Sequence, residues 1–476
     1  MHESRAAEES TVAAESTAAL SDGPKTSTSP SYGLRAHVLS PMETLAQSIS
    51  TIAPSATPAL TIPLVFALSG AGTGLTYVIA MVAIMLVALC VASFAKESAS
   101  PGSLYSYTRS SLPPVFSAVT AWALFFAYVM TASSVLGGFL NYAYVFLGGF
   151  GPRVSPVVLA LLGAGAAMWV AYRDVKISAR LMVWIEAVSV CLITIVIGIT
   201  LWKHGLHVDR SQVRLHGVSA TGLRSGAMLA IFSFVGFESA TTLGAEARDP
   251  LKTIPRAVVW SALLAGLFFI VCAYGEVLGF HGAPGSLGDS TAPFRYLSMQ
   301  AGVRFAGPVI DAGVLVTMFA ATLACVIAAS RVLLLMAHHG LAHRRLRKTH
   351  LRNETPAIAS LLTALLAFLP VGVLAHRGVS GADIYGWTGT LAVFGFLTAY
   401  TLASIAVAVH LRREQRLTAG GAVLSVAAAA VMLAALLGNI FPVPPAPYLY
   451  FPYIYAAYLG AALVWYWIAR GRAAQG

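Results

Sequence analysis

Residues 232–239 read Phe-Ser-Phe-Val-Gly-Phe-Glu-Ser, inside an apolar run that continues to about residue 247. Gly236 weakens a helix, and Glu238 carries a carboxylate that lipid disfavours. The two residues stand near the middle of a segment long enough to cross a bilayer. A glycine and an acid in such a place need a structural or functional reason, which the rest of the chain has to supply.

The composition of this 476-residue chain indicates a membrane protein. Hydrophobic residues make up 57% of the chain and charged residues only 10%, whereas about 25% of the residues in a soluble domain are charged. The net charge is +11, and we expect the basic residues to set membrane orientation rather than to bind nucleic acid. We interpret the four cysteines as small core residues, because they lack the spacing of a disulfide framework or metal site: Cys90, Cys191, Cys272 and Cys325.

Apolar runs of a length suited to cross a bilayer recur along the chain after residue 40. The first 40 residues are rich in Ser, Thr, Ala and Glu and have no apolar period, so we predict a disordered tail for them. Twelve spans follow, which places both termini on one side of the membrane. They lie at about 45–69, 74–95, 115–146, 155–172, 179–202, 223–247, 256–280, 305–337, 356–376, 383–410, 419–440 and 449–470.

The distribution of basic residues predicts on which side of the membrane the two termini lie. Most of the 30 Lys and Arg residues fall in the tail and in the loops on its side, so both termini should be cytoplasmic. The densest basic cluster follows span eight, where His339 and His343 have the i, i+4 spacing of a metal pair. No carboxylate or cysteine completes a ligand set there, so we expect a solvated cytoplasmic face with neither metal nor cofactor.

Spans one and six contain helix breakers. Pro54, Pro58 and Pro63 each remove a backbone donor from span one, and Gly236 weakens span six. Lipid offers no hydrogen bonds, so a broken helix at membrane depth is tolerated only where its backbone meets protein or lines a cavity. Either break alone could be a simple kink or a close-packing point. Breaks in corresponding positions of two five-helix units indicate a transporter site between inverted repeats.

The direction of the two spans predicts what such a site would bind. The outer half of span one would present free amides around Ser55, Ala56 and Thr57, a positive dipole end suited to a carboxylate. The outer half of span six would end in unpaired carbonyls near Phe234 and Val235, suited to an ammonium group. A zwitterionic amino acid fits both ends.

Several motifs resemble the amino acid–polyamine–organocation superfamily of permeases. Residues 232–239 look like the sixth-helix signature of that family. The loop after that helix, the loop between helices two and three and the end of helix eight agree as well: Glu-Ala-Arg-Asp-Pro at 246–250, Thr-Ile-Pro-Arg-Ala at 253–257, Ser-Pro-Gly-Ser-Leu-Tyr-Ser-Tyr at 100–107, Ala-Ser-Arg-Val-Leu at 329–333 and His-Gly-Leu at 339–341.

The resemblance implies an all-α membrane protein with a LeuT-like five-plus-five inverted repeat, broken helices one and six, and alternating access. Residues 41–410 would form this ten-helix transport core, and residues 411–476 would add two helices. In the family, helix-one amides bind the substrate carboxylate, helix-six carbonyls bind the amino group, and helices three, six, eight and ten face the side chain. The implied substrate contacts are Ile52, Ala53, Pro54, Ser55, Ala56, Thr57, Phe232, Phe234, Val235, Gly236 and Phe237.

Two acids inside the spans are candidates for proton coupling or gating. Glu186 lies two turns into span five and Glu238 lies deeper in span six, where an acid is costly unless it is protonated, paired or hydrated. The resemblance implies a switching role for Glu238. For Glu186, a packing hydrogen bond or a salt bridge with an arginine is the alternative. Glu276 and Asp311, near the outer ends of spans seven and eight, are expected to be solvated.

The sequence therefore predicts a secondary transporter that moves amino acids or related amines across the cell membrane, coupled to protons. An exchanger of the same fold and a non-transporting nutrient sensor are the alternatives. The spans contain no paired catalytic motif of an intramembrane enzyme, so we do not expect an enzyme. The small and aromatic residues at the breaks predict a neutral or aromatic-tolerant substrate. Oligomeric state and transport direction are left open.

Overall fold

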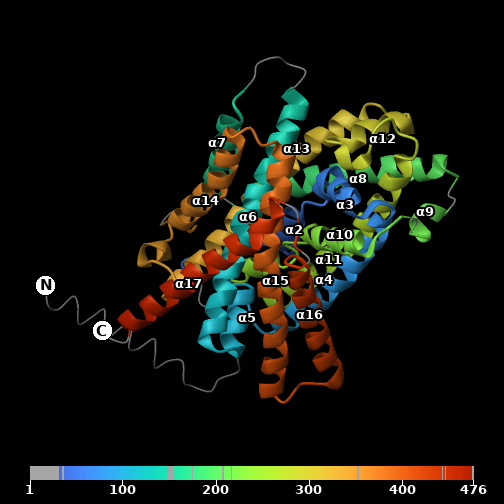
Figure 1. The fold of residues 1–476 in the computed structure, drawn as a ribbon. Coiled ribbons are helices and arrows are strands. Elements are labelled where there is room, and N and C mark those ends of the chain that lie inside the picture. The colour runs from blue at the N-terminus through green and yellow to red at the C-terminus, as the bar shows by residue number, and fades with distance from the viewer. Residues whose placement is uncertain are drawn as a thin grey trace, which may run out of the picture. The chain divides into compact units, whose positions relative to one another are not determined.

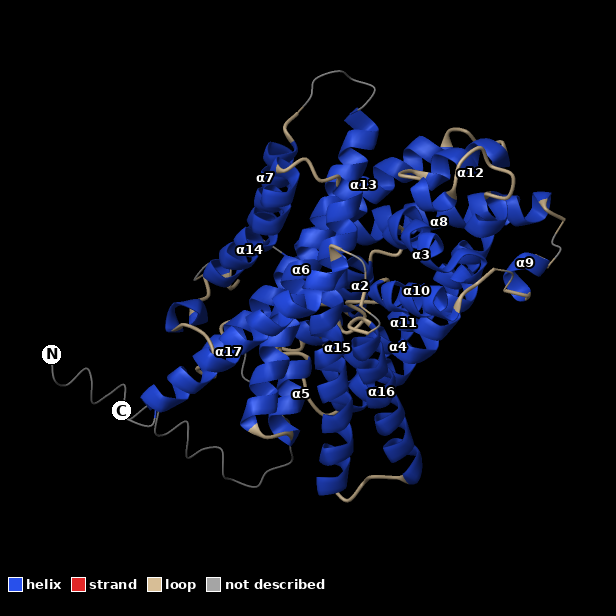
Figure 2. Cartoon of the chain, viewed as in Figure 1, coloured by secondary structure: helices blue, strands red, loops and turns tan. Residues whose placement is uncertain are grey.

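The computed structural model describes residues 32–34, 37–147, 154–173, 175–205, 208–215, 217–350, 353–441, 443–444 and 446–473. These residues form helices joined by turns and loops and contain no β-strand beyond one isolated bridge (Figure 2). The predicted tail falls outside the described residues up to residue 31.

Ten described segments are long and apolar enough to cross a membrane, compared with twelve predicted spans. The difference has two sources. The first two predicted spans lie in one apolar segment, Pro41–Ala95. The sixth predicted span is divided into helices that are each too short to cross a membrane. Each remaining predicted span contains one long helix. These helices are α6 (Pro114–Leu147), α7 (Pro156–Arg173), α8 (Val175–Lys203), α11 (Pro250–Gly279), α13 (Ala306–His338), α14 (Ala357–His376), α15 (Gly381–Arg413), α16 (Ala419–Gly438) and α17 (Phe451–Ala473).

The first apolar segment is interrupted where the prolines stand. Helix α2 (Pro41–Ile52) begins with a capping box between Ser40 and Glu43, and it ends at Ala53, whose φ of 51° lies in the left-handed region. A residue before proline is disfavoured in the helical region, so Pro54 helps to end α2 there. A short π-helix, η2 (Thr57–Thr61), then leads into α3 (Ile62–Ser69), and the turn η3 (Gly70–Gly72) leads into α4 (Thr73–Ala95).

The second interruption follows α10 (Ala220–Phe232), which is only 13 residues long. Residues 233–238 form turns, with Gly236 at a φ of 96°, before the 3-10 helix η4 (Ser239–Leu243). Glycine reaches this φ without the steric cost that a side chain would add. The short helices α5 (Leu104–Ser111), α9 (Arg210–Val213) and α12 (Pro293–Ala301) complete the fold.

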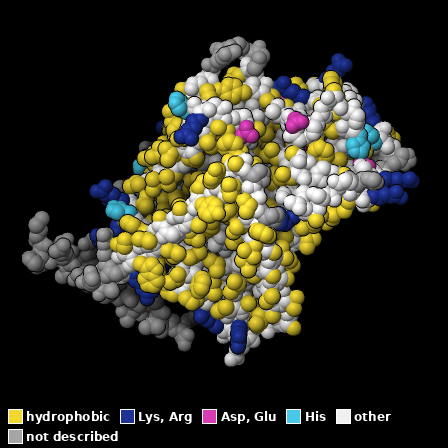
Figure 3. All heavy atoms as spheres, in the orientation of Figure 1, with side chains coloured by type: hydrophobic (Ala, Val, Ile, Leu, Met, Phe, Trp, Pro, Cys, Tyr) yellow, Lys and Arg dark blue, Asp and Glu magenta, His cyan; other side chains and the backbone are white. Residues whose placement is uncertain are grey.

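Helices α6, α13 and α15 form the packed centre of the bundle. Helix α6 runs along both α13 and α15, α4 runs along α11, and α7 runs along α14 (Figure 1). Large hydrophobic side chains that this core does not bury are exposed mainly on the other helices. In Figure 3 hydrophobic side chains cover most of the visible face and charged ones lie toward its edges, as expected for a surface in contact with lipid. The chain is a multi-pass membrane protein.

The cysteine prediction holds for three residues of four. All four thiols are free, and Cys90, Cys272 and Cys325 are buried as expected. Cys191 is exposed on α8, so its assignment to the core is wrong. An apolar run does not show which residues of a helix face other helices and which face lipid, because both environments are apolar.

Candidate functional site

The two interruptions lie against each other. The Ser48 hydroxyl of α2 donates to the Phe237 carbonyl at 2.7 Å and accepts from the Ala240 amide at 3.1 Å. A Cβ atom on Gly236 would stand 2.2 Å from a methyl carbon of Thr51. Gly236 is therefore needed for this close approach as well as for its positive φ.

A cavity of about 10 Å³ lies between the breaks. This is room for about one water molecule, so the site is nearly filled in this conformation. None of its described lining residues is acidic or basic. Six of them are predicted contacts: Ile52, Ala53, Ala56, Thr57, Phe232 and Val235. The other five were not predicted: Thr51, Thr131, Val135, Ser233 and Tyr385.

The remaining predicted contacts, Pro54, Ser55, Phe234, Gly236 and Phe237, are not among the lining residues. Both phenylalanines are fully buried in the packed core. The Phe234 ring meets Phe269 with centroids 5.3 Å apart, and the Phe237 ring meets Tyr400 at 5.4 Å. These two side chains thus have ordinary packing roles here.

Glu186 reaches the first break from α8. Its carboxylate accepts hydrogen bonds from the Ser55 amide at 2.6 Å, from the Ser55 hydroxyl at 3.1 Å and from the Thr317 hydroxyl of α13. The Ala56 amide donates to the Ala53 carbonyl at 2.9 Å. The expectation of free amides at Ser55 and Ala56 is therefore wrong for this conformation, because a side chain from another helix and a tight turn satisfy them.

Glu238 is fully buried between three helical segments. The hydroxyls of Tyr128 on α6 and Tyr400 on α15 each donate to its carboxylate at 2.7 Å. Glu238 is not among the residues that line the cavity. The carboxylate thus joins the segment after the second break to α6 and α15.

We call the end of the bundle where α2 begins the N-terminal side, and the opposite end the far side. On the N-terminal side, Leu39 and Ala247 form the isolated parallel bridge. The Leu39 amide donates to the Glu246 carbonyl, and the Arg248 amide donates to the Leu39 carbonyl, both at 2.8 Å. Arg331 of α13 donates to both carboxylate oxygens of Glu246 at 2.6 and 2.8 Å, and both side chains are buried.

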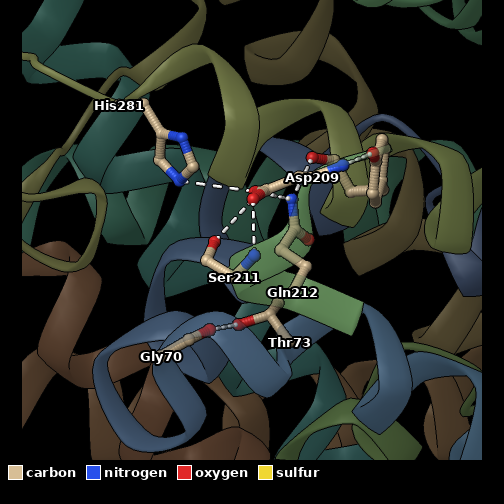
Figure 4. Close-up of polar contacts among 7 residues, drawn as sticks. Gly70, Thr73, Asp209, Ser211, Gln212 and His281 are labelled. Atoms are coloured by element: carbon tan, nitrogen blue, oxygen red, sulfur yellow. Dashed lines mark hydrogen bonds and ion pairs between the residues drawn. The ribbon is translucent and has the colours of Figure 1, made fainter. Parts of the chain in front are cut away.

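On the far side, the segment before α10 is tied to the end of α11 through Asp209 (Figure 4). The Asp209 carboxylate accepts from Ser211 and Gln212 and stands 3.4 Å from the His281 ring. Burial alone would raise the pKa of Asp209, but these hydrogen bonds and the Coulombic interaction with His281 outweigh it and lower the pKa. Figure 4 places this cluster next to the Gly70–Thr73 turn.

Two acids that we expected to be solvated are buried. Glu276 has no exposed surface, and neither of its carboxylate oxygens has a hydrogen-bond partner among the described residues. Asp311 is buried and pairs with Arg295 at 2.5 Å. The expectation of solvation is wrong for both. Glu276 lies inside the helix bundle, and α12, a helix absent from the prediction, packs against α13 and supplies Arg295 to Asp311.

The histidine pair after span eight has other partners. The Nδ1 atom of His339 lies 2.8 Å from the Tyr105 hydroxyl. Burial, followed by the charge of Arg109, lowers the pKa of His339 to about 4. In the described part of the chain, no group of three or more His, Cys, Asp or Glu side chains is placed to hold a metal ion.

Comparison with known proteins gives consistent matches to transporters. The model of a family described as amino acid permease matches residues 39–464. A branched-chain amino acid permease of Bacillus subtilis is 26% identical over 384 residues, 74% of this chain and 77% of that protein. A methylthioribose transporter of the same bacterium is 24% identical over 371 residues, with the same coverage. An uncharacterized transporter of Mycobacterium tuberculosis is 30% identical over 340 residues, 70% of this chain and 72% of the relative.

Proposed function

The chain belongs to the amino acid permease family, as its motifs indicated, and on this premise we propose that it is a secondary active transporter of amino acids. It would work by alternating access across the cell membrane, with both termini cytoplasmic. Residues 41–410 would form the twofold five-helix core and residues 411–476 two further helices, giving twelve spans in all.

The observation that carries this proposal is the neutral cavity between two interrupted helices. Backbone dipoles at the two breaks suit the carboxylate and ammonium groups of an amino acid. The side chain would lie against Val135, Phe232 and Tyr385, and the described lining offers no acid to attract a cationic side chain. We therefore propose a neutral, apolar amino acid as the substrate, which agrees with the branched-chain permease among the relatives.

Glu186 supports a specific form of proton coupling. Its carboxylate occupies the Ser55 amide that a substrate carboxylate would need. Two carboxylates cannot share this amide without strong repulsion. In our proposal a proton binds to Glu186, the Ser55 N–H is released, and the substrate carboxylate takes the hydrogen bond.

Glu238 would act as the gate on the N-terminal side of the cavity. Its bonds to Tyr128 and Tyr400 join three helical segments and would have to break before that side opens. Protonation of Glu238 would weaken both bonds, because hydrogen bonds to a charged acceptor are stronger than those to a neutral one.

Uptake into proteoliposomes tests the proposal. We expect saturable uptake of labelled leucine, valine or phenylalanine in preference to lysine, with accumulation when an inward proton gradient is imposed. Uptake only against a preloaded amino acid would instead assign an exchanger. No saturable uptake or exchange for any amino acid or amine would reject transport and favour a sensor.

Two substitutions test the coupling separately. Gradient-driven accumulation with unchanged pH dependence in Glu238→Gln would reject a proton role for Glu238, and the same result in Glu186→Gln would reject the role of Glu186.

A further inference from the structure

A second cavity, of about 310 Å³, lies on the far side between α3, α10, α15 and α16. Its volume falls at the lower end of the roughly 300–1,000 Å³ that is usual for ligand sites. Its walls are mainly apolar, and the side chains that form them include Leu64, Leu68, Met228, Leu229, Val393 and Phe394. None of these residues lines the cavity between the breaks, so the two cavities are distinct.

Arg224 of α10 brings a positive charge into this apolar pocket. Its Nη1 atom donates to the Phe441 carbonyl at 3.0 Å. Its Nε atom is buried and has no hydrogen-bond partner in the part of the chain that the structure describes. A buried charged donor without a partner is costly, so a turn of the Arg224 side chain that brings Nε to an acceptor inside the pocket would be favourable.

The other polar groups in the pocket are uncharged. Thr221, Ser225, Thr390 and Asn439 contribute hydroxyl and amide groups, and no acidic residue is among the described lining residues. The pocket therefore attracts a negative charge and offers no counter-ion for an ammonium group. Its chemistry differs in this respect from the two-ended site proposed for a zwitterionic substrate.

We propose that this pocket is a second ligand site, which binds a small amphipathic carboxylate from the aqueous phase. The carboxylate accepts hydrogen bonds from the guanidinium of Arg224, turned so that its Nε edge faces the pocket, since paired hydrogen bonds from arginine to a carboxylate are strong. The apolar body of the ligand packs against Leu64, Met228 and Phe394. The volume suits an acid the size of a branched-chain or small aryl acid.

The position of the pocket gives such a ligand an effect on transport, an inference that rests on the proposed function. Helix α3 follows the first break and α10 precedes the second. A ligand between them and α15 would hold the far-side halves of both interrupted helices in place. Bound carboxylate should therefore slow transport without competing for the substrate cavity.

Two halves of leucine separate this site from the substrate site. 4-Methylpentanoate keeps the carboxylate and side chain of leucine, and 3-methylbutylamine keeps the ammonium group and side chain. Binding to the purified full-length chain is measured by isothermal titration calorimetry in detergent. We expect the carboxylate to bind and the amine not to bind.

Variants of the pocket then locate the binding. Arg224→Gln should weaken 4-methylpentanoate binding about 10- to 100-fold, the range for loss of a charge-assisted hydrogen bond. Arg214→Gln, which removes an exposed arginine of the far-side segment before α10, should leave binding unchanged. Ser225→Phe fills the pocket and keeps the charge, and it should also abolish binding, which keeps the test valid if Arg224→Gln does not fold.

Several results would overturn the proposal. They are the absence of 4-methylpentanoate binding, equal binding of the amine, and unchanged binding in both Arg224→Gln and Ser225→Phe. Binding of palmitate without binding of the short acid would assign the pocket to a bilayer lipid instead. Because binding is measured without transport, Arg224-dependent binding to a chain that transports nothing would reject the proposed function and keep the site.

Discussion

Removing one hydroxyl group beside Glu238 should loosen the N-terminal side of the bundle without unfolding it. Tyr128→Phe and Tyr400→Phe each delete one of the two donors that meet this carboxylate at 2.7 Å. The aromatic packing is kept, since both rings meet Phe396 with centroids 5.3 and 5.6 Å away. Each substitution therefore tests one hydrogen bond.

The size of the effect follows from the charge of the acceptor. A hydrogen bond to a charged group contributes about 1.5–3 kcal/mol, and about 1.4 kcal/mol changes an equilibrium tenfold. Each substitution should then shift the equilibrium between the present form and an open form about 10- to 100-fold. The two effects should not add, because both hydroxyls bond the same carboxylate.

Hydrogen–deuterium exchange measures this shift directly. Amides of residues 236–248, which follow the break, should exchange faster in both variants by about the same factor as the equilibrium shift, whereas α14 should be unaffected. Tyr142→Phe is the matched control. It removes a tyrosine hydroxyl from the same helix, α6, but that hydroxyl donates to the neutral Ala59 carbonyl at 3.1 Å.

Two outcomes would refute the reasoning. The first is unchanged exchange of residues 236–248 in both Tyr128→Phe and Tyr400→Phe. The second is an equal increase in Tyr142→Phe, which would show general loosening of α6 rather than release of Glu238.

Three further predictions concern buried and surface charges. In Glu186→Gln, substrate binding measured by calorimetry should depend little on pH between about 5 and 8, because a glutamine side chain does not titrate. Persistent pH dependence of binding would contradict this. Arg331→Met should destabilise the protein by about 3–5 kcal/mol, since it leaves Glu246 buried without its partner. Adding Glu246→Gln to this variant should restore much of the lost stability, as measured by thermal melting. Burial raises the pKa of Glu97, but hydrogen bonds from His410 and a neighbouring arginine outweigh it and lower the pKa. This carboxylate should therefore stabilise the protein at pH values above its ordinary pKa and lose that effect as pH falls below about 4, and Glu97→Gln should make the melting temperature less dependent on pH in this range.

Features that depend on local sequence could be predicted from it. Proline and glycine act on their own backbone, so the breaks near Pro54 and Gly236 could be located without knowing their neighbours. The length of each apolar run located the long helices, because this length can also be read from the local sequence alone. The family resemblance then supplied the correct kind of protein.

Features that depend on distant partners could not be predicted. Ser55 and Glu186 are 131 residues apart, and nothing in either segment shows that the carboxylate will meet the amide. Tyr400 stands 162 residues from Glu238. The ion pair of buried Asp311 depends on Arg295 of a short amphipathic helix that hydropathy does not reveal.

The contacts between α2 and residues 237–248 have a mechanical consequence. Hydrogen bonds link the two segments at Ser48 and at Thr51, and the bridge at Leu39, just before α2, adds a further link. The N-terminal-side halves of both interrupted helices should therefore swing as one rigid body. A covalent cross-link between Ser48 and Ala240 would leave this movement free, whereas one between α2 and α13 would stop it. One displacement would then open the path from the N-terminal side to the cavity between the breaks, so the two half-helices would not need separate conformational changes.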